Sequence, residues 1–208
     1  MAASNDHGTP GSAFPDPAGL PAGYPGGLEA DVCLSDGRRA HIRPILPTDA
    51  AGLAAAIAAA DAETLRLRFL GWRPVLDDAT LQHLVDVDYR WRLALVAFDP
   101  AGQGVGVARY EGREGEEAAE VAVAVTPEWR QVGLGSQLLT MLGHAAVDRG
   151  IRRFVASYLE ENQDVEGLVT ASGLPYRNHL SHGVIEVELT LSAVEPPEPP
   201  RPDDQLPA

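Results

Sequence analysis

The part of the chain that most constrains its fold is the stretch of residues 120–159, out of 208 in total. In residues 120–125, valines alternate with glutamate and alanine, which predicts a strand with two largely apolar faces and therefore a central place in a sheet. A turn with two glycines follows, then leucines at helical spacing up to Gly150, and then residues 152–159, which predict a second strand. Together these segments predict a βαβ unit.

The segments on either side of this unit supply the rest of the fold. Short alternating runs bounded by turn residues predict strands, and polar N-cap residues before apolar periodic runs predict helices. Strands are expected at 32–34, 41–45, 93–98, 105–110 and 183–191, and helices after Thr48, Asp61 and Asp77 and at 162–172. The expected fold class is α+β, with a mixed, mostly antiparallel sheet of six to seven strands flanked by four to five helices.

Composition divides the chain into one domain and two tails. Residues 1–27 contain five prolines and six glycines with few large apolar side chains, which predicts a disordered leader. Residues 192–208 are rich in proline and acidic residues, which predicts a disordered tail. The folded domain is therefore expected at residues 28–191, a length typical of a single domain.

The charge and the cysteine content exclude several classes of function. The chain has 30 acidic residues against 16 basic ones, all of them arginine, and a net charge of −14, so it should repel nucleic acid and anionic membranes. A single cysteine, Cys33, permits no internal disulfide and suits a cytoplasmic location. His179 and His182, expected in a loop, lack a recognisable ligand spacing, so no metal site is expected.

The turn between the buried strand and the following helix has the features of an anion site. Its glycines allow the backbone to approach a ligand closely, and the first amides of the helix point outward without partners. A P-loop would need a lysine, which the chain lacks, and a dinucleotide fingerprint would need a small residue where Leu138 stands. The alternative is a glycine-rich turn that binds nothing.

This turn resembles the signature of the GNAT superfamily of acyl-CoA-dependent N-acyltransferases, Gln/Arg-x-x-Gly-x-Gly/Ala, which residues 130–135 satisfy. The resemblance extends over about residues 40–191. It includes Arg43-Pro44, the Trp129-Arg130 pair before the turn, Arg149-Gly150 after the helix, and Glu161-Asn162. Segments 63–69, 90–97 and 119–123 are most similar to the Pat-like group of bacterial protein lysine acetyltransferases.

The resemblance implies a binding site for acetyl-CoA as co-substrate. Backbone amides of the turn would hold its pyrophosphate, and backbone groups of Val123 and Val125 would pair with its pantetheine arm. Asn162 would hydrogen-bond the pantetheine, or cap the following helix, or do both. The implied turn residues are Arg130, Gln131, Val132, Gly133, Leu134, Gly135 and Ser136.

Glu120 matches the carboxylate that takes a proton from the incoming amine in Pat-like enzymes, and such a step is required because an ammonium cannot attack a thioester. The alternative is a solvated glutamate at the start of a strand. Many superfamily members carry a tyrosine on the last helix to protonate the departing thiolate. Val169 stands there in this chain, and Tyr158 and Tyr176 are possible substitutes.

The resemblance implies direct acetyl transfer to an amine, with a protein lysine as the preferred acceptor and a monomer or homodimer as the assembly. A polyamine or aminoglycoside is the alternative acceptor, because the acidic surface would attract either kind of cation. A catalytically weak acyl-CoA-binding regulatory module is the alternative of a different class. The pairs Arg66/Arg68 and Arg90/Arg92 would either grip phosphates or an acidic partner, or form ordinary surface salt bridges.

Overall fold

The computed structural model describes residues 19–71 and 77–191, so the expected tail at 192–208 and most of the expected leader lie outside the described residues. Eight strands form a single sheet in the order β1-β2-β3-β4-β5-β6-β8-β7, in which only β5 and β6 are parallel. This confirms the α+β class and the βαβ unit. The strands are β1 Ala30–Cys33, β2 Arg39–Pro44, β3 Arg92–Phe98, β4 Gly104–Gly112, β5 Ala118–Val125, β6 Arg153–Leu159, β7 Tyr176–Ser181 and β8 Val184–Thr190.

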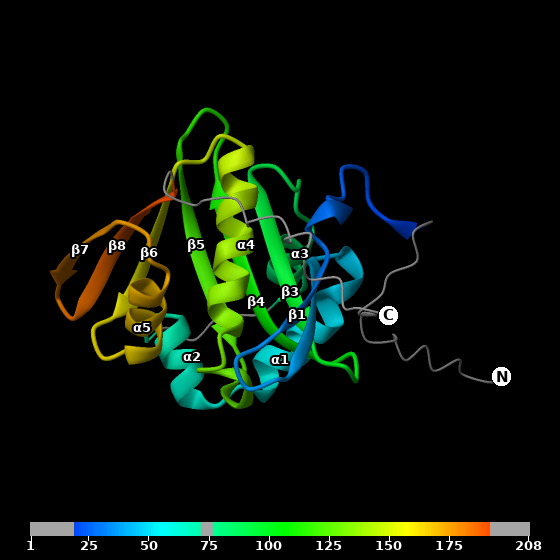
Figure 1. Ribbon diagram of the computed structural model, residues 1–208, viewed down its shortest axis with the longest axis horizontal. Helices are drawn as coiled ribbons and strands as arrows, with labels where there is room; N and C mark the ends of the chain where they lie inside the picture. Colours follow the sequence, from blue (N-terminus) through cyan, green and yellow to red (C-terminus); the bar gives the residue numbers. More distant parts are fainter. Residues whose placement is uncertain (1–18, 72–76, 192–208) are drawn as a thin grey trace, which may run out of the picture.

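Five α-helices in the described part of the chain cover the two faces of this sheet (Figure 1). Helices α4 and α5 lie on one face, while α1 and α3 pack on the other through a small cluster around Ile45, Val85 and Ala94. The helices are α1 Ala50–Ala59, α2 Ala62–Arg68, α3 Asp78–Val85, α4 Leu134–Asp148 and α5 Gln163–Ala171. None of them is long and apolar enough to cross a membrane.

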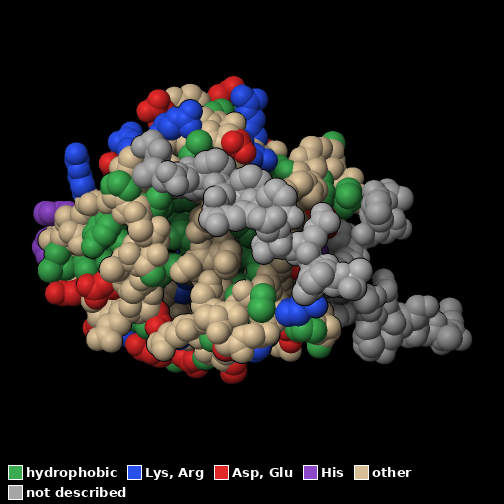
Figure 2. Space-filling view, in the orientation of Figure 1, with side chains coloured by type: hydrophobic (Ala, Val, Ile, Leu, Met, Phe, Trp, Pro, Cys, Tyr) green, Lys and Arg blue, Asp and Glu red, His purple; other side chains and the backbone are tan. Residues whose placement is uncertain are grey.

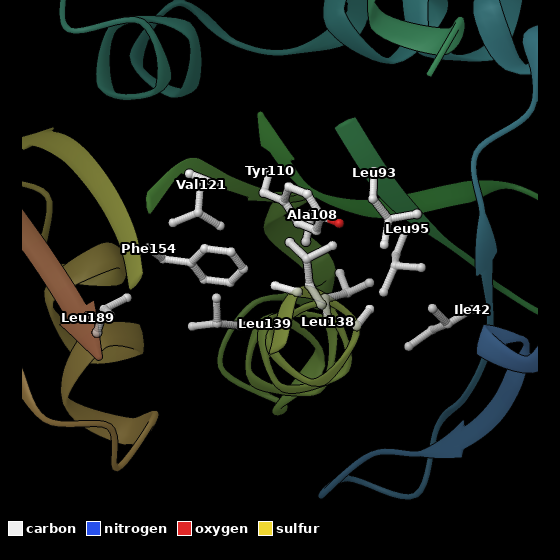
Figure 3. Close-up of a cluster of buried hydrophobic side chains, with 14 of the residues drawn as sticks. Ile42, Leu93, Leu95, Ala108, Tyr110, Val121, Leu138, Leu139, Phe154 and Leu189 are labelled. Carbon is white, nitrogen blue, oxygen red and sulfur yellow. The ribbon is translucent and has the colours of Figure 1, made fainter. Parts of the chain in front are cut away.

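The main core lies between α4 and the centre of the sheet (Figure 3). Leu138 and Leu139 of α4 face Ala108, Tyr110 and other side chains of the central strands. These side chains are almost completely shielded from water, and their burial stabilises the βαβ unit that was predicted from the sequence. The strand and the helix on either side of the glycine turn are therefore firmly held.

Two of the three residues predicted as helix N-caps are N-caps in the structure. Asp61 and Asp77 each accept a hydrogen bond from the amide three residues later, at 2.7 and 2.8 Å, which confirms both as N-caps. Thr48 is not the cap of α1, because a 3₁₀ turn at Pro47–Asp49 precedes this helix and Asp49 is its N-cap residue. The Asp49 carboxylate instead binds the buried side chain of Arg43.

The sheet has one strand more than the six to seven expected. Strand β7 pairs with β8 through a tight turn at His182 and Gly183, both of which have positive φ angles. Nearly every residue of β7 is exposed, so its sequence lacks the alternation that reveals a half-buried strand. His179 therefore lies in a strand, and only His182 lies in a turn.

The packed part of the chain begins before residue 28, the expected boundary of the leader. A 3₁₀ turn at Gly26–Leu28 follows Tyr24, whose ring packs edge-on against Tyr89 with ring centroids 5.7 Å apart. The Tyr24 hydroxyl donates to Glu29 at 2.9 Å. The high proline and glycine content of this segment predicts disorder, and therefore did not indicate that Tyr24 packs on the core.

Candidate active site

The central cavity opens where β5 and β6 separate. Their parallel pairing covers only Ala118–Glu120 against Arg153–Val155, and beyond Glu120 the two strands are no longer paired. A cavity of about 910 Å³ occupies the gap, and the surface is hollowed between α4 and α5 (Figure 2). Both the backbone of β5 and the start of α5 line this cavity, so residues far apart in sequence meet there.

The glycine turn lies at the end of β5, just before α4. Gln131 and Gly133 have positive φ angles of 58° and 89°, which turn the chain sharply into the helix. The amides from 131 to 136 donate no hydrogen bond to any described residue, and the first helical bond is donated by Gln137 to Gly133. Free amides at a helix N-terminus form a site for an anion.

The turn is held from outside by the hairpin between β1 and β2. The backbone amide and the hydroxyl of Ser35 both donate to the carbonyl of Val132, at 3.2 and 3.1 Å. Arg38 donates to the carbonyl of Glu128 at 2.8 Å and stacks over the Trp129 ring at 4.4 Å. These contacts hold the carbonyls of Glu128 and Val132 against the hairpin and leave the amides of the turn without partners among the described residues.

Arg130 forms three hydrogen bonds with the protein. Its guanidinium donates to the carbonyl of Val125 at 3.1 Å, to the hydroxyl of Thr64 on α2 at 3.1 Å, and to Asp164 on α5 at 3.3 Å. The side chain thus connects β5 with the starts of two helices at the cavity. The resemblance implies that Arg130 assists in holding the pyrophosphate; in the structure its Nε donates to the Val125 carbonyl, and the side chain lies in the cavity wall.

Asn162 caps α5 and also lines the cavity. Its side-chain oxygen accepts a hydrogen bond from the amide of Val165 at 3.3 Å, and the residue is only 7% exposed. The capping role considered from the sequence is therefore present. Its side-chain nitrogen has no hydrogen-bond partner among the described residues, so the donor is available to a ligand in the cavity.

Glu120 is the last residue of β5 that pairs with β6, and its side chain lines the cavity. It is exposed and forms no hydrogen bond or ion pair with any residue in the two described ranges. Arg68 of α2 and Arg109 of β4 are close enough to interact with it electrostatically. Burial lowers the pKa of Arg68, and the positive charge of Arg109 lowers it further, while Glu120 opposes both effects.

The two tyrosines considered as proton donors have different surroundings. Tyr158 on β6 is buried and lines the cavity, and burial raises its pKa, with Glu166 and Tyr176 adding to the shift. Tyr176 lies on the exposed strand β7. Val169 of α5 is buried and also lines the cavity, so an apolar side chain stands where the resemblance implies a tyrosine in other members.

Sequence reasoning did not foresee the part that β7 and β8 play in the site. Arg177 and His179 of β7 and Glu186 and Glu188 of β8 line the cavity, because these strands continue the sheet beyond β6. Arg177 and His179 could not be placed there because β7 was not predicted, whereas β8 was predicted as a strand but not as part of the site. No group of three or more potential metal ligands occurs in residues 19–71 and 77–191.

Comparison with known proteins identifies the family. The acetyltransferase (GNAT) domain family matches residues 39–174, so the chain belongs to the GNAT family and is an N-acetyltransferase. Acetyltransferase PA5475 of Pseudomonas aeruginosa is 30% identical over 143 residues, which are 67% of this chain and 77% of that protein. Acetyltransferase Pat of Mycolicibacterium smegmatis is 31% identical over 168 residues, 79% of this chain but only 49% of that protein.

A solved structure supports the same assignment. The GNAT domain of S. lividans PAT matches with a TM-score of 0.74 at 29% identity, over 80% of this chain and 99% of that one. The fold and the resemblance to Pat-like acetyltransferases, both expected from the sequence, are thereby confirmed. The chain spans about half the length of the M. smegmatis relative.

Proposed function

We propose that this protein transfers an acetyl group from acetyl-CoA to the side-chain amine of a protein lysine, with Glu120 as the general base. The observation that supports this most is the position of Glu120. An unpaired carboxylate lines the cavity where β5 and β6 separate, and the glycine turn with its free amides follows Val125 and Arg130, which line the same cavity. Such a carboxylate can meet an amine arriving beside a ligand bound along β5.

The cavity and the glycine turn beside it together fit acetyl-CoA. The amides from Val132 to Ser136 are free to hold its pyrophosphate, and Gln131 extends the same turn. We assign backbone groups of Val123 and the side-chain nitrogen of Asn162, which both line the cavity, to the pantetheine arm. When bound, acetyl-CoA supplies a thioester whose carbonyl carbon accepts the amine.

Val125 and Arg130, the two remaining residues of the expected site, support the cavity wall in this proposal. Val125 and Arg130 bind each other, so we assign Arg130 to bracing α2 and α5 at the cavity rather than to direct contact with phosphate. A guanidinium with three protein partners keeps the walls of the cavity at a fixed separation. In this proposal the backbone amides of the turn are the main ligands of the pyrophosphate.

Glu120 removes the proton that prevents attack by the amine. A lysine ammonium has no lone pair, so the carboxylate accepts one proton, directly or through a water molecule. The amine nitrogen then bonds to the acetyl carbon, the carbon–sulfur bond breaks, and CoA leaves as a thiolate. Thiolate is a fair leaving group near neutral pH, which makes a protein acid helpful but not essential.

The choice of acceptor rests on charge and access. The chain carries a net charge of −14, which attracts cationic acceptors, and Glu120 is exposed rather than enclosed. A lysine on the surface of another protein can reach a base that is exposed. A reaction in the cytoplasm, on proteins of the same cell, fits this proposal.

Incubation of the protein with labelled acetyl-CoA and a lysate of its host tests the proposal. Mass spectrometry should find label on lysines of other proteins, and a Glu120→Gln chain should leave those lysines unlabelled. Because the chain contains no lysine, every acetyl-lysine detected belongs to a substrate. Label on small amines alone would overturn the choice of acceptor, and tight CoA binding without any acetylated product would overturn the proposed activity.

A further inference from the structure

The sequence contains two pairs of arginines that are candidates for anion binding. In the structure, one of these four arginines has different surroundings from the other three. Arg66 forms ion pairs with Glu63 and Glu161, and Arg92 donates to the carbonyls of His83 and Asp86. Arg90 is exposed and stacks near Trp91. Arg68 differs from these three because it lines the cavity and makes no hydrogen bond or ion pair with any described residue.

The surroundings of Arg68 do not compensate its charge. The guanidinium carbon lies 5.2 Å from the centre of the Phe69 ring, a contact that offers no hydrogen-bond acceptor. Withdrawing a charged group from water without a partner is costly, so a partly buried guanidinium is normally hydrogen-bonded. Arg68 therefore retains unused donors at the edge of the cavity.

Arg68 and Glu120 together form a complementary pair of unused charges. The two side chains interact electrostatically but do not form an ion pair with each other. The other nearby charge, Arg109, is paired with Glu111 at 2.6 Å, so it adds little uncompensated charge. Of these three groups, Arg68 and Glu120 thus remain for a ligand, and Glu120 is the base of the proposed reaction.

We propose that Arg68 binds a carboxylate that the acceptor carries close to its reactive amine. The inference rests on the proposed function, because it assigns the amine to Glu120 and the carboxylate to Arg68. In a protein substrate the carboxylate belongs to an aspartate or glutamate beside the target lysine. The guanidinium matches a carboxylate because its planar fork donates two parallel hydrogen bonds.

A carboxylate fits this site better than a phosphate. Arg109 is neutralised by Glu111, so Arg68 offers a single uncompensated positive charge, and Glu120 stands nearby with a negative one. A phosphate dianion would carry excess negative charge beside Glu120, whereas a carboxylate balances Arg68. The carboxylate is expected on the acceptor because Arg68 interacts with Glu120, the group that receives the amine.

Matched acceptor pairs test the inference. One pair consists of two single-lysine peptides with blocked ends that differ only by aspartate or asparagine beside the lysine. The other pair is β-alanine and β-alaninamide. The ratio of kcat/KM within each pair is measured for the wild type, Arg68→Met, Arg68→Lys and, as a control remote from the cavity, the exposed Arg113→Met.

The wild type should favour the carboxylate-bearing member of at least one pair by about tenfold or more, the effect of a charged hydrogen bond. Arg68→Met should reduce that ratio to about one, Arg68→Lys should give an intermediate ratio since it keeps the charge but loses the fork, and Arg113→Met should keep the wild-type ratio. Equal losses for both members of a pair would show that Arg68 only positions Glu120 or the fold, and would overturn the inference.

Two further measurements separate this inference from the proposed function. Calorimetry of the same acceptor pairs in the presence of CoA reads carboxylate binding without turnover, so an inactive protein that still discriminates in binding would overturn only the proposed activity. Rates with succinyl-CoA and acetyl-CoA test the donor as the source of the carboxylate. A succinyl-CoA preference that Arg68→Met abolishes, with no discrimination between acceptors, would overturn the assignment to the acceptor.

Discussion

Arg43 and Glu120 project from the same face of the sheet, but only Arg43 has an oppositely charged side chain as a hydrogen-bond partner in the described part of the chain. Fully buried Arg43 donates to both oxygens of Asp49, at 2.8 and 2.7 Å, and we call these two residues the closed pair. Arg68 and Glu120, which we call the open pair, have no such partners in the described segments. The closed pair satisfies itself and serves the fold, whereas the open pair has its bonding capacity left for a ligand.

The largest expected effect concerns the closed pair. Asp49→Ala should lower the free energy of unfolding by about 3–5 kcal/mol, because it leaves the buried Arg43 without its carboxylate. It also removes the acceptor of the Leu46 amide, which donates to Asp49 at 2.8 Å. Urea denaturation measures the change.

Two further variants show whether the closed pair is purely structural. The double variant Arg43→Met/Asp49→Leu should recover much of the lost stability, because apolar side chains of similar size can replace a buried ion pair. Asp36→Ala breaks the exposed pair with Arg38 and should have a much smaller effect. A loss for Asp49→Ala no larger than that of Asp36→Ala would contradict the distinction between the two pairs.

The next effect in size is expected at the open pair. Glu120→Gln should lower kcat by about a hundredfold or more, because the amide cannot accept the proton of the ammonium. Its free energy of unfolding should stay within about 0.5 kcal/mol of the wild type, since the exposed side chain has no partner to lose. Initial rates with saturating acetyl-CoA, together with urea denaturation, measure both quantities.

Glu114→Gln is the control, because it removes an exposed carboxylate from the loop before β5 without touching the cavity. If Glu120→Gln retained the wild-type kcat, another group would be the base. Loss of stability comparable with that of Asp49→Ala would show that Glu120 belongs to the fold rather than to the chemistry.

A smaller effect is expected at the glycine turn that completes the site. Gly133→Ala should cost about 1–2 kcal/mol of unfolding free energy, because its φ of 89° strains any residue with a Cβ atom. It should also raise the KM for acetyl-CoA, since the strain displaces the amides that we propose to hold the pyrophosphate. Gly115→Ala is a matched control, with a φ of 81° in an exposed loop and open space around its Cβ.

Both glycine variants should therefore lose similar stability, and only Gly133→Ala should bind acetyl-CoA more weakly. An unchanged KM in Gly133→Ala would count against the turn as the pyrophosphate site. Isothermal titration with CoA separates weaker binding from any effect on turnover.

Sequence patterns predicted the buried strands and capped helices of the molecule far better than its exposed strand β7 and the packing of Tyr24. Alternation and capping residues located β5, α4 and the starts of α2 and α3, because these depend on local periodicity and local hydrogen bonds. Strand β7 was missed because exposure on both faces removes the alternation. The packing of Tyr24 on Tyr89 was missed because the high proline and glycine content of residues 1–27 predicts disorder, and a single aromatic residue does not change that prediction.

The site itself was only partly predictable for the same reason. The glycine turn and Glu120 follow from motif and strand pattern. Arg66 and Arg68 look equivalent in the sequence, yet they face different ways because a helix turns by about 100° per residue. Which of them finds a carboxylate depends on Glu63 and Glu161, and Glu161 lies far along the chain. The partners of Arg130 likewise come from three separate elements.

The smallest effect is expected at Tyr158, the one tyrosine considered as a proton donor that lines the cavity. Its pKa is raised by burial, so the hydroxyl stays protonated at neutral pH and could donate to a departing thiolate. Tyr158→Phe should nevertheless change kcat by about twofold or less, because thiolate leaves readily without an acid near neutral pH. Tyr176→Phe, on the exposed strand β7, is the control.

The pH dependence of kcat decides between the two mechanisms. If Tyr158 were an essential acid, Tyr158→Phe would lower kcat tenfold or more at neutral pH, and the wild-type rate would fall at alkaline pH as the hydroxyl ionises above its usual pKa of 10. If the open pair suffices, both chains should keep similar rates from pH 7 to about pH 9. A tenfold loss restricted to Tyr158→Phe would add a third residue to the chemistry and make the open pair an incomplete account of it.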